Sequence, residues 1–187
     1  MKLRGDGRGR APTGLGRVDV AVEGSATPFG TVNLGQNSSM NHELPIRRVK
    51  PEDSECVALH GCYRVDDAAR RPAYEVWVKR RIEAGAYLGR FAVVGDAVVA
   101  GAGAVLLDWG PTRANPSGTM ARIVNVYTEP TWRRQSLARR LLEALLADCE
   151  HCGVREFNLG STDEARRLYE SLGFQAYPAE MRRRVAT

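Results

Sequence analysis

The stretch TEPTWRRQSLARRLLEALL, residues 128–146, carries the side chains with the clearest capacity for chemistry. A proline stops a strand-like run, a basic turn follows, and a leucine-striped helix begins. The first N–H groups of a helix lack intrahelical partners and lie at the positive end of its dipole, so they attract anions. Arginines suit phosphate oxygens. The stretch predicts a diphosphate seat, and a helix start merely capped by Ser136 is the alternative interpretation.

A strand–helix–strand unit would hold this stretch in place. Residues 119–130 are rich in branched and aromatic side chains and predict a long strand that stops at Pro130. The following helix ends at Gly153, and residues 154–161 predict the next strand. The order implies two parallel strands joined by a right-handed crossover. The buried stripe of the helix would be Leu137, Leu141, Leu142, Leu145, Leu146 and Cys149.

The other predicted elements surround this unit. Their order implies an α/β (α+β) fold with a mixed, mostly antiparallel sheet, a central parallel strand pair and helices on both faces. They are a strand at 44–50, helices at 51–69 and 72–83, a hairpin at 86–110 turning at Gly95-Asp96, a helix at 162–174 and a strand pair at 174–185.

Composition divides the chain into two parts. Residues 1–43 hold eight glycines and few large apolar groups, so we predict a flexible, disordered N-terminal extension. A nucleic-acid-binding arm is a sharper hypothesis, which five basic against four acidic residues disfavours. Residues 44–187 are predicted to form one domain.

The sequence contains no run of ~18 uninterrupted apolar residues and no signal-like apolar segment near its start. It therefore predicts a cytoplasmic location and no membrane partner. Four cysteines are then expected as reduced thiols. CEHC (149–152) invites a zinc interpretation, but Cys56 and Cys62 have the spacing C-x5-C, so no metal is predicted.

The basic turn resembles the coenzyme-binding loop of the GCN5-related N-acetyltransferase (GNAT) superfamily. That loop has glutamine or arginine, two residues, glycine, one residue, then glycine or alanine. Serine occupies the central glycine position here, and it fits without strain only where the backbone is helical. The matching residues are Arg133, Arg134, Gln135, Ser136, Leu137 and Ala138.

A second motif of the same superfamily is Ala165, Tyr169 and Gly173-Phe174. The resemblance covers roughly 45–185 and implies a GNAT acetyltransferase domain at 44–187. Family members bind acetyl-CoA as a co-substrate, and many carry asparagine where this chain has Thr162.

The resemblance also implies roles for individual residues. Tyr169 would protonate the departing thiolate, the Val126 N–H would bind the oxyanion, and Glu129 is a candidate base. The alternatives are a core aromatic for Tyr169 and a solvated side chain for Glu129. The implied coenzyme-binding residues are Val126, Thr128, Arg133, Arg134, Gln135, Ser136, Leu137, Ala138, Arg139 and Thr162.

The implied function is N-acetyl transfer from acetyl-CoA to a primary amine of a small molecule or protein. Ser136 and the net charge of +5 keep open a GNAT-fold aminoacyltransferase that uses aminoacyl-tRNA as donor. Ser136 and Thr162 keep open a non-catalytic GNAT-like module. Because the fold often dimerises, a homodimer is a further expectation.

Overall fold

A computed structural model describes residues 44–62, 64–178, 181, 183 and 185; the extension predicted at 1–43 lies outside them. Its sheet has five strands in the order β1-β2-β3-β4-β5, with antiparallel pairs up to β4 and a parallel β4–β5 pair at the end. The predicted fold class is confirmed, but the parallel pair, which was predicted to be central, lies at the edge of the described sheet, because no described residue after 173 forms a strand beside β5. The strands are β1 (Ile46–Arg48), β2 (Tyr87–Val94), β3 (Ala97–Asp108), β4 (Thr119–Thr128) and β5 (Glu156–Asn158).

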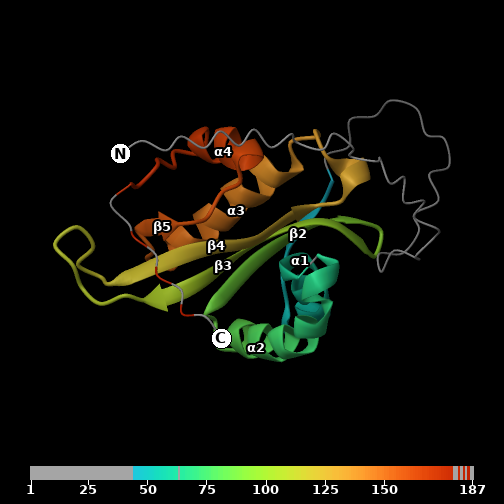
Figure 1. The fold of residues 1–187 in the computed structure, drawn as a ribbon, viewed down its shortest axis with the longest axis horizontal. Coiled ribbons are helices and arrows are strands. Elements are labelled where there is room, and N and C mark those ends of the chain that lie inside the picture. Colours follow the sequence, from blue (N-terminus) through green and yellow to red (C-terminus); the bar gives the residue numbers. More distant parts are fainter. Residues whose placement is uncertain (1–43, 63, 179–180, 182, 184, 186–187) are drawn as a thin grey trace, which may run out of the picture. The chain divides into compact units, whose positions relative to one another are not determined.

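Helices cover both faces of the sheet (Figure 1). One face carries α1 (Ser54–Gly61) and α2 (Arg71–Glu83), and the other carries α3 (Leu137–His151) and α4 (Asp163–Glu170). Within the described ranges, no helix has the length and apolar character needed to span a membrane. Short 3-10 turns lie at Pro51–Asp53, Val65–Arg70 and Pro130–Trp132.

Three predicted elements differ from the structure. The helix predicted over 51–69 ends at Gly61, because Cys62 and Arg64 leave the helical region before a 3-10 turn forms. The strand predicted at 154–161 shrinks to three residues, since only these face a partner on β4. The final strand pair is wrong for the described residues after 173, which lie in no strand. These described residues have no paired strand beside them.

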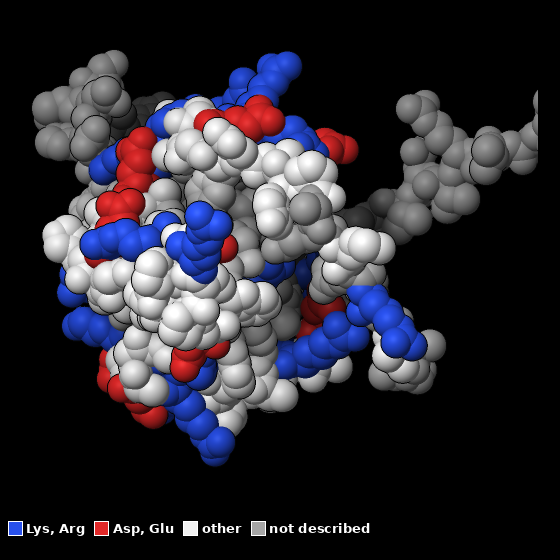
Figure 2. All heavy atoms as spheres, turned by 90° about the vertical axis from the view of Figure 1, so that its left-hand side faces the viewer, with Lys and Arg blue, Asp and Glu red and all other residues white. Residues whose placement is uncertain are grey.

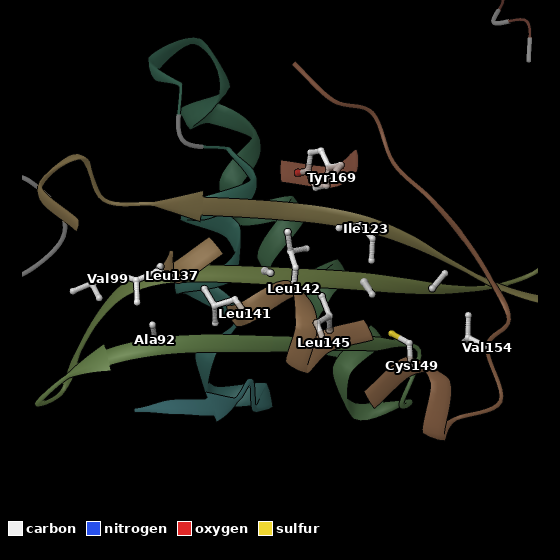
Figure 3. Packing of buried hydrophobic residues seen from close by; sticks show 14 residues of the cluster. Ala92, Val99, Ile123, Leu137, Leu141, Leu142, Leu145, Cys149, Val154 and Tyr169 are labelled. Carbon is white, nitrogen blue, oxygen red and sulfur yellow. The ribbon is translucent and has the colours of Figure 1, made fainter. Parts of the chain in front are cut away.

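The leucine stripe of α3 forms the larger core, as predicted (Figure 3). Leu141, Leu142 and Leu145 are fully buried, and burial of each such side chain stabilises the fold by about 1.5–3 kcal/mol. They pack near Ala100, Ala102 and Ala104 of β3, whose small side chains let the helix approach the sheet closely.

The glycines that alternate with these alanines belong to the opposite face of β3. A Cβ at Gly101 would lie 2.6 Å from His60 Nδ1, and one at Gly103 would overlap the Tyr87 hydroxyl. Glycine within a strand commonly marks such a close approach. The repetitive AGAGA run therefore separates two packing surfaces, one for α3 and one for α1 and α2.

An ionic cluster centred on Asp148 ties α3 to the first two strands. Arg90 donates to both carboxylate oxygens at 2.6 and 2.8 Å, and Arg48 donates to one of them at 2.9 Å. Burial alone would raise the pKa of Asp148, but the hydrogen bonds and charges of the two arginines outweigh it, so this pKa is lowered.

We expect Asp148→Asn to lower the free energy of unfolding at pH 7 by about 1–3 kcal/mol, because charged hydrogen bonds are lost. Since the unfolded chain binds this proton more readily, the contribution of Asp148 is present above the ordinary aspartate pKa. It is lost as the pH falls through the lower pKa of the folded state. Urea unfolding of both proteins at several pH values measures this difference.

The matched control is Asp67→Asn, which breaks a more exposed pair with Arg70. Such a pair contributes under about 0.5 kcal/mol. Equal losses in the two variants would contradict the role assigned to Asp148.

Candidate functional site

The basic turn between β4 and α3 contains two residues in the left-handed region of backbone conformation. Arg134 has φ 65° and Ser136 has φ 58°. The sequence left open whether residue 136 is helical, and the structure shows that it is not. Left-handed backbone costs a non-glycine residue roughly 1–2 kcal/mol, so serine here carries strain that the family's glycine would avoid.

Ser136 does not cap α3 through its side chain, which makes no capping hydrogen bond. Its carbonyl accepts the first helical bond from the Arg140 N–H at 3.1 Å. The N–H groups of 137–139 therefore have no helical carbonyl behind them. Together with the helix dipole, these groups form what we call the anion seat. Leu137 anchors it, being only 3% exposed.

The arginines around the anion seat are held in different ways. Arg133 turns back and donates from Nε to the Thr128 carbonyl at 3.1 Å. Arg139 bonds to Glu143 and to the Ser171 hydroxyl, which ties the start of α3 to the end of α4. Arg140 donates to the Leu44 carbonyl near β1. Arg134 and Gln135 are exposed beside the seat.

The edge of β4 that faces β5 is open beyond its first residues. Pairing with β5 covers only Met120–Arg122, whereas β4 continues to Thr128. Val126 and Thr128 thus lie on a stretch with one paired edge and, among the described residues, one open edge. An extended chain with amide groups can add to such an edge through backbone hydrogen bonds. The open edge leads directly into the turn before the anion seat.

Tyr169 reaches the core from α4, apart from the leucine row of α3 (Figure 3). Its ring is 8% exposed and packs edge-on against Phe174, with 5.9 Å between ring centroids. Among the described residues its hydroxyl has no hydrogen-bond partner. Burial raises the pKa of Tyr169, so the hydroxyl keeps its proton and can donate it. The core and acid interpretations of Tyr169 are therefore compatible.

Thr162 begins α4 as its N-cap, and its hydroxyl accepts from the Ala165 N–H at 3.4 Å. Threonine and asparagine both cap helices well. The departure from the asparagine of many family members therefore leaves the start of α4 intact.

Glu129 follows β4 and is partly enclosed. Its Oε1 is buried and has no hydrogen-bond partner among the described residues. Burial raises the pKa of Glu129, and a hydrogen bond from Tyr127 counteracts part of that rise. A buried carboxylate oxygen that nothing satisfies is a group that can accept a proton from a bound molecule.

Tyr127 and His60 form a contact that sequence reasoning missed. Their ring centroids lie 4.9 Å apart, and His60 also meets Phe91 edge-on at 5.4 Å. Burial lowers the pKa of His60 to about 4, so the imidazole is neutral near pH 7. The sequence does place Cys56 and His60 on one helix face, four residues apart. Nothing local indicates that this face meets Tyr127.

The described thiols and acidic groups are not gathered in one cluster. Cys149 is fully buried in the α3 stripe, whereas Cys152 is exposed. Within the part of the chain that the structure describes, no three His, Cys, Asp or Glu side chains are grouped to hold a metal ion.

Comparison with family models identifies an acetyltransferase (GNAT) domain at residues 73–185. A search of curated proteins finds no match. Similar solved structures include a predicted acetyltransferase with acetyl-CoA from Clostridium acetobutylicum (19% identity, 76% of this chain, 96% of that chain, TM-score 0.70). A GCN5-related N-acetyltransferase from Ralstonia eutropha JMP134 is also similar (24% identity, 78% and 100%, TM-score 0.71).

A third similar structure is an aminoglycoside acetyltransferase from an uncultured soil metagenomic sample. Its identity is 16%, the coverage is 77% of this chain and 99% of that chain, and the TM-score is 0.60. At these identities the likeness establishes the fold.

Replacing Ser136 by glycine should stabilise the protein. Removing the strain of the left-handed backbone raises the free energy of unfolding by about 1–2 kcal/mol. The greater freedom of glycine in the unfolded chain lowers it by about 0.5–1 kcal/mol. We expect a net gain of roughly 0.5–1 kcal/mol, measured by urea unfolding.

Ala138→Gly serves as the control, because residue 138 lies within α3. This change should destabilise by about 1 kcal/mol. A Ser136→Gly variant that loses as much stability as the control would show that φ at this position is not strained.

Proposed function

Because the chain belongs to the GNAT acetyltransferase family, we propose that it transfers the acetyl group of acetyl-CoA to a primary amine of a small molecule or a protein. The family is one of acyltransferases, so the general class of the reaction follows from membership. The acceptor and the residue roles below are part of the proposal.

One observation carries the proposal: the open edge of β4 runs directly into the anion seat. Acetyl-CoA has an amide-containing pantetheine arm that ends in a diphosphate, and it needs these two features in this order. The backbone of Val126 and Thr128 would pair with the arm, and the N–H groups of 137–139 would hold the diphosphate. Arg134, Gln135 and Arg139 lie beside those N–H groups.

The reaction forms a C–N bond and breaks the C–S bond. The amine attacks the thioester carbonyl, and the Val126 N–H stabilises the oxyanion of the tetrahedral intermediate. Glu129 takes the proton that the amine nitrogen gives up. Collapse of the intermediate expels the thiolate, which takes a proton from the Tyr169 hydroxyl. Tyr169 suits its role because its hydroxyl is protonated and makes no hydrogen bond to a described residue. Glu129 suits its role because its buried Oε1 has no hydrogen-bond donor among the described residues.

An aminoacyl-tRNA donor is the second candidate, and the strained Ser136 is the observation behind it. Charge offers it little support on the face drawn in Figure 2, where basic and acidic side chains are interspersed. A tRNA substrate would be held by many phosphate contacts, so its affinity would fall steeply as salt rises.

The proposal is tested by titrating the purified full chain with acetyl-CoA and then measuring thiol release with a panel of primary amines. We expect Tyr169→Phe to bind acetyl-CoA as the wild type does but to lose roughly tenfold or more in turnover, because only proton donation is removed. Tyr177→Phe, at an exposed tyrosine, is the control and should keep its rate.

An unchanged rate in Tyr169→Phe would remove this residue as the acid. Failure of the wild type to bind acetyl-CoA, with binding restored by Ser136→Gly, would instead favour aminoacyl-tRNA as the donor.

The pH dependence of turnover should report the ionisation of Glu129. Its pKa is raised by burial, so the rate should fall on the acid side at a pH above the usual glutamate range. Tyr127→Phe removes a hydrogen bond that lowers this pKa, so it should shift the acid limb to higher pH. Glu129→Gln should lower kcat by roughly tenfold or more and abolish that limb.

Turnover at saturating amine across pH 5–9 measures both effects. An acid limb that stays in place in Tyr127→Phe belongs to another group, such as the substrate amine, and would argue against Glu129 as the base.

A further inference from the structure

A bulge interrupts β4 shortly after its pairing with β5 ends at Arg122. Val124 pairs with Gly103 and Tyr127 pairs with Gly101, so two residues of β4 face the single Ala102. The two residues opposite Ala102 are Asn125 and Val126, one more than regular pairing allows, and Asn125 has φ 55°. A bulge of this kind bends the strand and re-aims the backbone groups beside it. The bulge therefore determines where the Val126 N–H points.

The side chain of Asn125 is fixed by two tyrosines from other elements. Its Nδ2 donates to the Tyr87 hydroxyl of β2 at 3.1 Å and to the Tyr74 hydroxyl of α2 at 2.9 Å. The Tyr74 hydroxyl in turn lies 3.2 Å from Asn125 Oδ1 and donates to it. Asparagine adopts left-handed backbone more readily than most residues. Backbone and side chain thus both suit this position.

Two glycines make room for this amide–tyrosine cluster. A Cβ at Gly61 of α1 would lie 2.8 Å from Asn125 Oδ1, and a Cβ at Gly103 would overlap the Tyr87 hydroxyl. Tyr87 is 3% exposed. The Tyr87 hydroxyl is strongly constrained, because in this buried position a lost hydrogen bond has no water to replace it. The cluster therefore joins α1, α2, β2 and β3 to one peptide segment of β4.

We propose that Asn125 is a positioning residue for the acetyl-transfer site: its amide, clamped by Tyr74 and Tyr87, holds the bulge in which the Val126 N–H meets the developing oxyanion. The inference rests on the proposed function for the identity of the oxyanion. It adds that the direction of the Val126 N–H is set by the Asn125–Tyr74–Tyr87 cluster, on the face of the sheet that α1 and α2 cover. The amide of Asn125 is engaged by the two tyrosines, so the role assigned to it is positioning and not contact with the reacting atoms.

Removing the amide while keeping the left-handed backbone isolates this role. Asn125→Gly does so, because glycine adopts positive φ freely. Loss of one well-placed oxyanion donor lowers kcat by about 10²–10³; a misaimed donor should lose part of this, so we expect kcat to fall about 10–100-fold. The KM and Kd for acetyl-CoA should change less than about threefold, since the anion seat lies elsewhere on the chain.

Two further variants separate positioning from stability. Tyr74→Phe removes one clamping hydroxyl and should lower kcat in the same direction, by roughly three- to tenfold. Asn115→Ala removes a buried amide elsewhere in the fold, one that donates to the Thr119 carbonyl and to Glu156. It should lower the melting temperature as Asn125→Gly does, but leave kcat within about twofold. Equal kcat in Asn125→Gly and wild type would overturn the proposal.

A readout that needs no turnover keeps the inference separate from the proposed function. In 15N-labelled protein, the resonance of the Val126 amide should shift in Asn125→Gly and also in Tyr74→Phe, where the substituted residue is distant in sequence, while Asn115→Ala leaves it unchanged. A Val126 amide that is unaffected by Asn125→Gly would refute the positioning role. If wild type acetylates no amine yet Val126 responds as expected, the proposed function fails and the structural role of Asn125 stands.

Discussion

The site depends on one constraint: β4 must stay paired with β3 along its length while its other edge stays free. Pairing with β5 ends at Arg122, so the backbone beyond it is available. The leucines of α3 press on the alanine face of β3 and hold this sheet without needing a longer β5. Among the described residues, the edge of β4 beyond Arg122 is therefore open, and the proposed function places the pantetheine arm of acetyl-CoA there.

The turn that forms the anion seat keeps its shape although Ser136 is unfavourable for its backbone conformation. Ser136 occupies left-handed backbone at a cost of about 1–2 kcal/mol. The burial of Leu137 and of the stripe behind it outweighs this strain, so the turn keeps its shape. In the proposed function, an anion would be bound there by backbone N–H groups and the helix dipole, which do not depend on the side chain at 136.

Burial raises the pKa of both titratable groups of the proposed mechanism, Tyr169 and Glu129, and the rise has a different consequence for each. It raises the pKa of Tyr169, whose proton is thereby kept for a leaving thiolate. It also raises the pKa of Glu129, which makes its carboxylate a stronger base, and the hydrogen bond from Tyr127 partly reverses that rise. The neighbouring His60 stays neutral, so it adds no charge beside the carboxylate.

The sequence by itself determined the family, the order of the main elements, the leucine stripe of α3 and the hairpin turn at Gly95, because each is written in local spacing or motif. It could not determine the bulge at Asn125, the contact between His60 and Tyr127, or the left-handed backbone of Ser136. The tyrosines that clamp Asn125 lie 38 and 51 residues away along the chain. The strand pair predicted at 174–185 likewise does not form among the described residues. Such features arise only when distant segments pack together, since register, exposure and pKa are set by neighbours in space rather than in sequence.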